Sequence, residues 1–213
     1  MITYRPVTRQ VRLVLATRNA HKAGEIARLL DGSGVSCVGL DAFPEMREVV
    51  EDCDTLEGNA AKKAVETARV CRAWALADDT GLEVAALHGA PGVFSARWAG
   101  PGCTDADNRD KLVRELAGVA PRDRAARFRT VLALSSPDGR VRTAEGRLDG
   151  SIAEAPRGRG GFGYDPLFAL PDGRTLAELA PEEKNALSHR GLALRAILPD
   201  LRALGAATSG ERA

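Results

Sequence analysis

The chain has 213 residues, 44% of them hydrophobic and 28% charged, which is an ordinary composition for a globular protein with one sizeable core. Its formal net charge of +1 excludes a general electrostatic field for nucleic acid or a membrane surface. An anionic ligand therefore needs a local cluster of basic groups. No run of 18 apolar residues and no apolar N-terminal segment occur, so we expect no membrane partner and a cytoplasmic location.

The four cysteines, at positions 37, 53, 71 and 103, are too widely spaced to form a CxxC pair. His21 and His88 also lack the HExxH spacing of many zinc sites. Reduced thiols are therefore expected, and a zinc or redox site is disfavoured.

The N-terminal half alternates between strand and helix patterns. Residues 1–10 are polar and are expected to form a loose lead-in. Residues 11–16 show the alternation of a strand, and residues 22–30 show the spacing of a helix, with Thr17 to His21 as the connection. A second helix is predicted over residues 54–74.

Two helix starts carry capping residues. Asp54 and Glu57 are predicted to form a capping pair for the second helix, and Thr104 with Asp107 marks a third helix that runs to about Leu116. After it, residues 127–134 and 140–145 are predicted as paired strands around a Ser-Pro-Asp-Gly turn.

The C-terminal part begins with a glycine-rich loop over residues 156–163. Pro181 opens a short helix, Ser188 caps a last helix that continues to about Leu201, and residues 202–213 form a frayed tail. We therefore predict a single domain over residues 11–201. Strand–helix alternation followed by hairpins indicates an α/β fold with a mixed sheet, flanking helices and two lobes around a central cleft.

The segment Asp78-Asp79-Thr80-Gly81 lies between two apolar runs, residues 73–77 and 82–87. Two carboxylates at the end of a buried strand are costly unless their charge is compensated, and Mg²⁺ is suited to oxygen ligands. Neighbouring side chains of a strand point to opposite faces, so one of the two aspartates faces a given site. The alternative is an Asp-Gly turn that closes a hairpin.

Thr17, Asn19 and Lys22 fall at a strand-to-helix turn. Unpaired backbone N–H groups at a helix N-terminus attract phosphate, and these three side chains would complete an anion site. The alternative is plain helix capping with a solvated lysine. The GxxxxGK[ST] loop of P-loop proteins is absent.

An acidic run, Glu51-Asp52-Cys53-Asp54, precedes the second helix. Its carboxylates either help to hold Mg²⁺ or complement the helix dipole. On that helix, Lys62 and Lys63 either form a polar face or supply one lysine that reaches a phosphate.

Residues 158–163 match GxGxxG, but a proline precedes the segment and Pro166 follows it, so the strand and helix of a dinucleotide site are missing. We interpret it as a loop in which Phe162 stacks on a base or enters the core. A nicotinamide oxidoreductase is therefore poorly supported.

Further along the chain, three basic side chains lie close together in the sequence: Lys184, His189 and Arg190. The alternative is that they form a solvated helix face.

Six segments, in order along residues 11–201, resemble the inosine triphosphate pyrophosphatase family. They are Thr17-Arg18-Asn19-Ala20-His21-Lys22, Gly58-Asn59-Ala60 with Lys63, Ala77-Asp78-Asp79-Thr80-Gly81-Leu82, residues 89–97 (GAPGVFSAR), residues 160–166 (GGFGYDP) and residues 182–191 (EEKNALSHRG). Each is modest alone, but their shared order makes chance unlikely.

The resemblance implies Mg²⁺-dependent hydrolysis of non-standard purine nucleoside triphosphates (ITP, dITP and XTP) to the monophosphate and pyrophosphate. It implies an elongated α/β fold and a homodimer, and the net charge of +1 predicts no stable nucleic-acid partner. Asp79 would be the general base or metal-linked catalytic residue and Glu51 the second metal carboxylate. The substrate-binding residues it implies are Thr17, Arg18, Asn19, Ala20, His21, Lys22, Lys63, Thr80, Phe162, Gly163, Tyr164, Asp165, Lys184, His189 and Arg190.

The chain departs from the family pattern at the acidic run, where Glu-Glu-Thr-Gly is common, and at Gly58, where a glutamate is common. Arg190 is the candidate hydrogen-bond donor to a purine 6-keto oxygen. The 6-amino group of adenine is itself a donor, so it cannot accept this hydrogen bond. The rival interpretations are a pyrophosphatase of the septum-inhibitor type, acting on pyrimidine or modified nucleotides, and a nucleotide-binding module without turnover.

Overall fold

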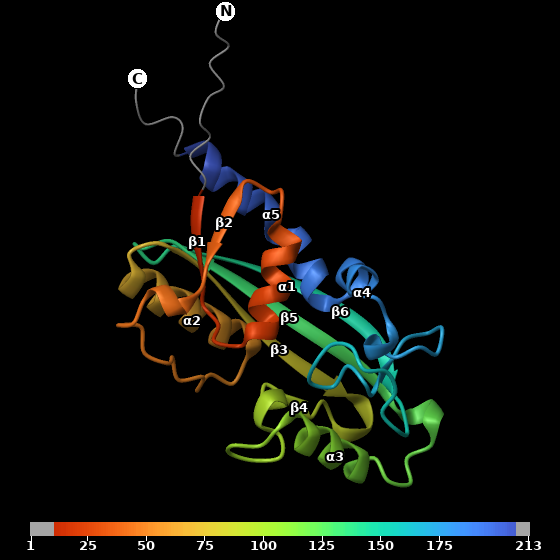
Figure 1. The fold of residues 1–213 in the computed structure, drawn as a ribbon. Helices are drawn as coiled ribbons and strands as arrows, with labels where there is room; N and C mark the ends of the chain where they lie inside the picture. The colour runs from red at the N-terminus through yellow and green to blue at the C-terminus, as the bar shows by residue number, and fades with distance from the viewer. Residues whose placement is uncertain (1–10, 208–213) are drawn as a thin grey trace, which may run out of the picture.

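The computed structural model describes residues 11–207, so the predicted lead-in and the last six residues lie outside the described part. Its centre is one mixed sheet with strand order β2-β1-β3-β5-β6-β7, and β4 pairs with β3 (Figure 1). The strands are β1 Val11–Leu15, β2 Val35–Val38, β3 Trp74–Val84, β4 Pro91–Gly92, β5 Ala125–Ser135, β6 Val141–Ile152 and β7 Phe168–Ala169. β1 runs parallel to β2 and β3, whereas β3, β5, β6 and β7 form antiparallel pairs.

Five helices flank this sheet: α1 Ala20–Leu30, α2 Leu56–Cys71, α3 Asp105–Glu115, α4 Pro181–Leu187 and α5 His189–Ala207. α2 packs its alanines Ala60 and Ala64 against Ala77 and Val131 on one face. α1 and α5 cover the other face, where their apolar side chains meet Leu76, Leu132 and Leu134. The predicted mixed α/β fold with flanking helices is therefore confirmed.

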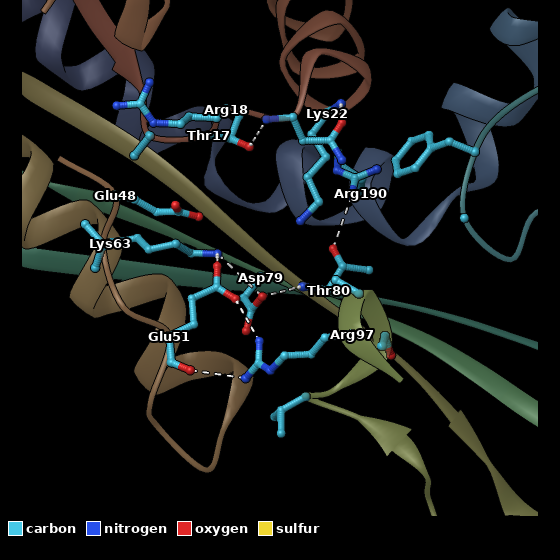
Figure 2. A pocket seen from close by; sticks show the side chains of 18 of the residues that line it. Thr17, Arg18, Lys22, Glu48, Glu51, Lys63, Asp79, Thr80, Arg97 and Arg190 are labelled. Carbon is cyan, nitrogen blue, oxygen red and sulfur yellow. Dashed lines mark hydrogen bonds and ion pairs between the residues drawn. The ribbon is translucent and has the colours of Figure 1, made fainter. Parts of the chain in front are cut away.

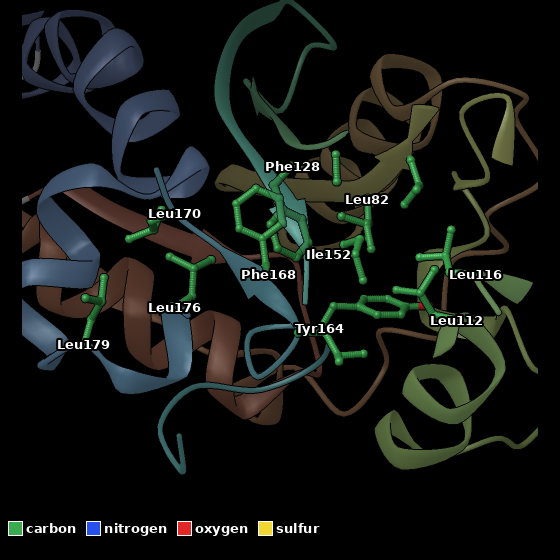
Figure 3. Packing of buried hydrophobic residues seen from close by; sticks show 13 residues of the cluster. Leu82, Leu112, Leu116, Phe128, Ile152, Tyr164, Phe168, Leu170, Leu176 and Leu179 are labelled. Atoms are coloured by element: carbon green, nitrogen blue, oxygen red, sulfur yellow. The ribbon is translucent and has the colours of Figure 1, made fainter. Parts of the chain in front are cut away.

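Two apolar cores lie toward opposite ends of the long strands β3 and β5. One surrounds Leu76 of β3 with α1 and α5. The other surrounds Leu82 of β3 and Phe128 of β5, and joins α3 to β7 (Figure 3). The middle of these strands, between the cores, carries the polar residues Asp78, Asp79 and Thr80, and this arrangement gives the molecule its two lobes.

The Asp78-to-Gly81 segment is not a turn. β3 is one continuous strand of 11 residues, in which Asp78 pairs with Leu132 and Gly81 with Arg129 of β5. The prediction that a strand ends at Asp78 and Asp79 is therefore wrong, and so is the alternative of an Asp-Gly turn that closes a hairpin. Basic side chains from the flanking helices compensate the two carboxylates, so the strand continues through them. Gly81 lies against β4, since a Cβ there would lie 2.8 Å from the Gly92 carbonyl oxygen.

The second helix is shorter than predicted. Its N-cap is Thr55, whose hydroxyl accepts from the Gly58 N–H at 3.0 Å, so the predicted Asp54–Glu57 capping pair is wrong. Glu57 instead accepts from Arg129 at 2.8 Å. The helix ends at Cys71 because Arg72 adopts a left-handed conformation with φ 50°.

The other predicted elements are close to those observed. Thr104 and Asp107 form the expected reciprocal cap of α3. β5 and β6 pair as predicted but extend further, to Ile152. α5 begins after Ser188, whose hydroxyl accepts from the Gly191 N–H, and continues past Leu201 to Ala207. Within residues 11–207, no helix has the length and apolar character to cross a membrane.

α5 approaches the sheet unusually closely at one point. A Cβ at Gly146 of β6 would collide with the backbone carbonyl oxygen of His189. The glycine therefore lets the first turn of α5 lie directly on the sheet. This contact brings His189 and Arg190 to the polar middle of β3 and β5.

Candidate active site

A cavity of about 710 Å³ opens between the two lobes, over the middle of β3. All but two of the predicted site residues line it. The lining residues among them are Thr17, Arg18, Asn19, Lys22, Glu51, Lys63, Asp79, Thr80, Phe162, Gly163, Tyr164, Asp165, Lys184, His189 and Arg190. Ala20 and His21 are not among the lining residues. Segments from almost the whole length of the chain therefore meet at one place.

The start of α1 forms one wall of the cavity. Asn19 is the N-cap, and its side-chain oxygen accepts from the N–H groups of His21 at 3.0 Å and Lys22 at 3.1 Å. Thr17 accepts in turn from the Asn19 N–H at 3.2 Å. Lys22 is not solvated, because its Nζ lies 3.1 Å from Asp78 Oδ2 and only 18% of its side chain is exposed. The capping interpretation is thus correct for Asn19 and wrong for Lys22.

Lys63 projects from α2 into an acidic cluster (Figure 2). Its Nζ lies 2.6 Å from Glu51 Oε1, 3.5 Å from Asp79 Oδ1 and 2.6 Å from the Asp78 carbonyl oxygen. Lys62 instead pairs with the exposed Asp52. Of the two lysines, Lys63 is therefore the one that reaches the cavity.

The acidic cluster shifts the ionisation of its members. Burial, which outweighs the nearby Lys63 ammonium, raises the pKa of Asp79. Burial alone would lower the pKa of Lys63, but the carboxylates of Asp79, Asp78 and Glu51 raise it overall. Asp79 is therefore a stronger proton acceptor than an ordinary aspartate, beside a lysine that stays charged.

The donor set fits a hard divalent cation. Asp79 Oδ2 is buried and has no hydrogen-bond partner among residues 11–207, and such a carboxylate oxygen suits a cation or the proton of a bound water. Glu51 faces the same lysine ammonium as Asp79. Mg²⁺ is commonly held by one or two carboxylates, with substrate oxygens and water completing its shell. Among the described residues, no group of three or more His, Cys, Asp or Glu is placed to hold a metal.

Asp78 faces the opposite side of β3, as strand alternation predicts. Its Oδ2 lies 3.1 Å from both Lys22 Nζ and Arg190 NH2. Burial would raise the pKa of Asp78, but the charges of Lys22, Arg190 and Lys63 lower it overall. Asp78 is therefore an ionised anchor for basic residues, whereas Asp79 faces the acidic cluster.

Glu25 of α1 was not predicted from the sequence. It is buried, binds Lys184 Nζ at 2.7 Å and also accepts from Arg190 NH1. Lys184 Nζ lies 2.7 Å from Asp165 Oδ2 as well. A charged residue among the apolar positions of a predicted helix, one before Ile26, was the available signal. Glu25 ties α1 to α4 and α5 beneath the cavity.

Phe162 lines the cavity and does not enter the core. Its ring stacks on His21 with centroids 5.4 Å apart, and Lys184 Nζ lies 5.1 Å from the same ring. Tyr164, two residues on, is buried in the core and donates its hydroxyl to the Ser95 carbonyl at 2.9 Å. Burial raises the pKa of Tyr164, so the phenol stays protonated.

Arg97 and Glu48 also line the cavity and were missed as site residues. Arg97 donates to the Glu51 carbonyl at 3.1 Å and lies 3.6 Å from its carboxylate (Figure 2). Arg97 ends the GAPGVFSAR segment, so the sequence carried a signal for it. Arg18 fixes the neighbouring loop by donating to the Met46 carbonyl at 2.6 Å.

The fold and the site together define an α/β protein whose cleft suits an anionic ligand that carries a divalent cation. The Ham1 family model matches residues 13–200, and the chain belongs to this family. The family resemblance predicted from the six segments is therefore confirmed.

Curated relatives and solved structures agree with this assignment. The chain is 49% identical over 195 residues to a protein of Desulforamulus reducens named dITP/XTP pyrophosphatase, covering 91% of this chain and 97% of that one. A protein of Geobacter sulfurreducens with the same name is 52% identical over 190 residues, covering 89% and 95%. A HAM1 protein structure from Coxiella burnetii matches with a TM-score of 0.79 and 39% identity, covering 93% of this chain and 98% of that one.

Proposed function

We propose that this protein hydrolyses non-standard purine nucleoside triphosphates (ITP, dITP and XTP) to the monophosphate and pyrophosphate, with Mg²⁺. The observation that carries the proposal is the cluster of Lys63, Glu51 and Asp79 beside the N-terminus of α1, inside one cavity. The curated relatives named dITP/XTP pyrophosphatase support the choice of substrate. The reaction would remove altered nucleotides from the precursor pool.

Residues at the start of α1 would bind the phosphates. Asn19 uses its amide oxygen as the cap and keeps its NH2 group for a ligand, and the Thr17 hydroxyl lies beside it. Lys22 lines the cavity and can share its charge between Asp78 and a phosphate oxygen. These donors would stabilise the negative charge of the leaving pyrophosphate.

Asp79 would act as the general base. Water attacks the α-phosphorus, Asp79 takes up its proton, and the bond between the α-phosphorus and the bridging oxygen breaks to release pyrophosphate. Without a bound cation, burial raises the pKa of Asp79, which favours uptake of a proton. Glu51 and Asp79 would hold Mg²⁺, which when bound neutralises phosphate charge.

Phe162, Gly163, Tyr164 and Asp165 would surround the base. Arg190 directs its donors at Asp78, Glu25 and Thr80, which leaves one N–H on NH1 for a ligand. Lys184 likewise keeps one of its three N–H groups after binding Glu25 and Asp165. We propose that the donor to a purine 6-keto oxygen comes from this lysine–arginine pair.

We also propose that the enzyme is a cytoplasmic homodimer, by analogy with the family, and that it binds no nucleic acid stably. The net charge of +1 supports the last point, because it provides no general field for a polyanion. Light scattering of the purified protein would test the dimer, and a mass of one chain would contradict it.

The test of the function is pyrophosphate release with Mg²⁺ from ITP, XTP, GTP, ATP, dTTP and UTP, measured side by side. We expect a strong preference for ITP and XTP. Preference for dTTP or UTP would favour a pyrophosphatase of the septum-inhibitor type. No release from any nucleotide, together with retained binding, would indicate a binding module.

A further inference from the structure

A chain of hydroxyl groups runs beneath the cavity from β3 to α5. Thr80 Oγ1 lies 2.7 Å from Thr130 Oγ1, which lies 2.6 Å from Nδ1 of His189. Thr130 is completely buried and His189 is 4% exposed. At its other end, Thr80 Oγ1 lies 3.2 Å from Asp78 Oδ2 and accepts from Arg190 NH2 at 3.1 Å.

The charged groups at one end set the direction of every proton in this chain. Arg190 can only donate, and ionised Asp78 can only accept. If Thr80 gives its proton to Asp78, then Thr130 must donate its hydroxyl proton to Thr80. Thr130 then has no proton left to donate to His189. His189 must then donate from Nδ1 to Thr130.

The opposite direction leaves one contact without a proton. If Thr80 donated to Thr130 and Thr130 donated to His189, two oxygen lone pairs would face each other between Thr80 and Asp78. A hydrogen bond to an ionised carboxylate is stronger than one between neutral hydroxyls. The direction that starts at Asp78 is therefore the one that satisfies all of these contacts.

The second nitrogen of His189 remains for a ligand. Burial, with the charges of Arg190 and Lys184, lowers the pKa of His189 well below its ordinary value, so the ring is neutral. His189 lines the cavity, and within residues 11–207 Nε2 has no hydrogen-bond partner. A neutral ring that is protonated at Nδ1 has a lone pair at Nε2.

We propose that Thr130 is a positioning residue that holds His189 as the Nδ1–H tautomer, so that Nε2 accepts a hydrogen bond from the N1–H of a 6-keto purine. Hypoxanthine and xanthine carry that proton, whereas N1 of adenine carries a lone pair and would face Nε2 without a proton. This inference rests on the proposed function and adds a second contact, beside the 6-keto oxygen, at which adenine is rejected. Guanine also carries N1–H, so its rejection has to arise elsewhere in the cavity.

The tautomer can be tested without any substrate. Long-range ¹H–¹⁵N spectra distinguish protonated from unprotonated ring nitrogens, and the chain has only three histidines. The signal lost in His189→Asn assigns the ring. We expect Nδ1 to be protonated and Nε2 unprotonated in the wild type, and an unprotonated Nδ1 would overturn the proposal.

The role in base choice is tested with Thr130→Val, which keeps the shape of the side chain and removes its hydroxyl. We expect the Nδ1–H signature to be lost, and the ratio of kcat/KM for ITP over ATP to fall roughly 10-fold, the scale of one hydrogen bond. KM for ITP should change more than kcat. Thr130→Ser should restore both the spectrum and the ratio, and Thr143→Val, at an exposed site of β6, is the matched control.

Each result is decisive. An unchanged ITP-to-ATP ratio in folded Thr130→Val would overturn the role of Thr130. If that variant fails to fold, the wild-type spectrum still decides the tautomer. If the wild-type enzyme hydrolyses none of the nucleotides, the proposed function fails, whereas the tautomer stands or falls on the spectrum.

Discussion

Asp78 and Asp79 are neighbours in the chain but lie in opposite electrostatic surroundings. Asp78 faces Lys22 and Arg190, and their charges lower its pKa in spite of burial. Asp79 faces Glu51 as well as Lys63, and burial raises its pKa. One residue of separation on a strand therefore yields one permanent anion and one carboxylate that can exchange protons.

Asp79→Asn should retain the fold and nucleotide binding but lose turnover by roughly 10²-fold or more, the scale of a general base. The amide keeps the shape of the side chain and cannot take up the proton of water. Pyrophosphate release from ITP measures kcat, and circular dichroism checks the fold. Asp52→Asn, at an exposed aspartate nearby, is the control. Near-normal hydrolysis by Asp79→Asn would remove Asp79 from this role.

Phe162→Ala should raise KM more than it lowers kcat. The ring lines the cavity beside Lys184 and His21, so its loss removes contact with the base in both the ground state and the transition state. Steady-state kinetics with ITP provide the measurement. Equal losses of kcat and kcat/KM would point instead to a contact made only in the transition state.

At the scale of elements, the N-terminal turns of the helices carry basic side chains that line the cavity. α1 presents Lys22 from its first turn, α5 presents His189 and Arg190, and α2 presents Lys63 from its second turn. The capping residue fixes the first residue of a helix, and it therefore determines which side chains lie in the first turns. In α2 the cap is Thr55, although Asp54 is an equally suitable residue type.

Thr55→Ala should lower the free energy of unfolding by about 1 kcal/mol, because the Gly58 N–H loses its partner. Asp54→Ala, one residue earlier, is the matched control and should have a much smaller effect. Urea unfolding of both variants gives the comparison. A larger loss for Asp54→Ala than for Thr55→Ala would show that Asp54 is the cap in solution.

At the scale of the whole molecule, a buried ionic network joins distant parts of the chain. Glu25 of α1 binds Lys184 of α4 and Arg190 of α5, and Lys184 also binds Asp165. Burial would raise the pKa of Glu25, but Arg190 and Lys184 lower it below its ordinary value of 4.5. Because the folded pKa is lowered, this stabilisation is present above the unfolded pKa and is lost as the pH falls through the folded pKa.

Glu25→Gln should lower the free energy of unfolding by about 3 kcal/mol near neutral pH, since two buried cations each lose one of their two carboxylate partners. The difference from the wild type should shrink as the pH falls through the lowered pKa of Glu25, because Glu25 of the wild type then takes up its own proton. Urea unfolding across this range measures the difference. Glu115→Gln, at an exposed site, should show no such trend, and a constant difference for Glu25→Gln would contradict the electrostatic explanation.

The amino-acid sequence by itself determined the five helices, the long strands, the family and about half of the residues that line the cavity, but not the short strands β2, β4 and β7. Local patterns carried that information: the reciprocal cap at Thr104, the spacing of Thr17, Asn19 and Lys22, and the order of the six segments. These signals act over a few residues, so they can be interpreted without knowing what lies across the fold.

Only the tertiary structure decided how the buried charges are paired. It showed that β3 continues through Asp78 and Asp79, that Lys63 and not Lys62 reaches the cavity, and that Glu25 belongs beneath it. Each outcome depends on a partner far away in the chain, such as Arg190 for Asp78. A buried charge is tolerated only beside such a partner, and the position of that partner is a property of the folded molecule.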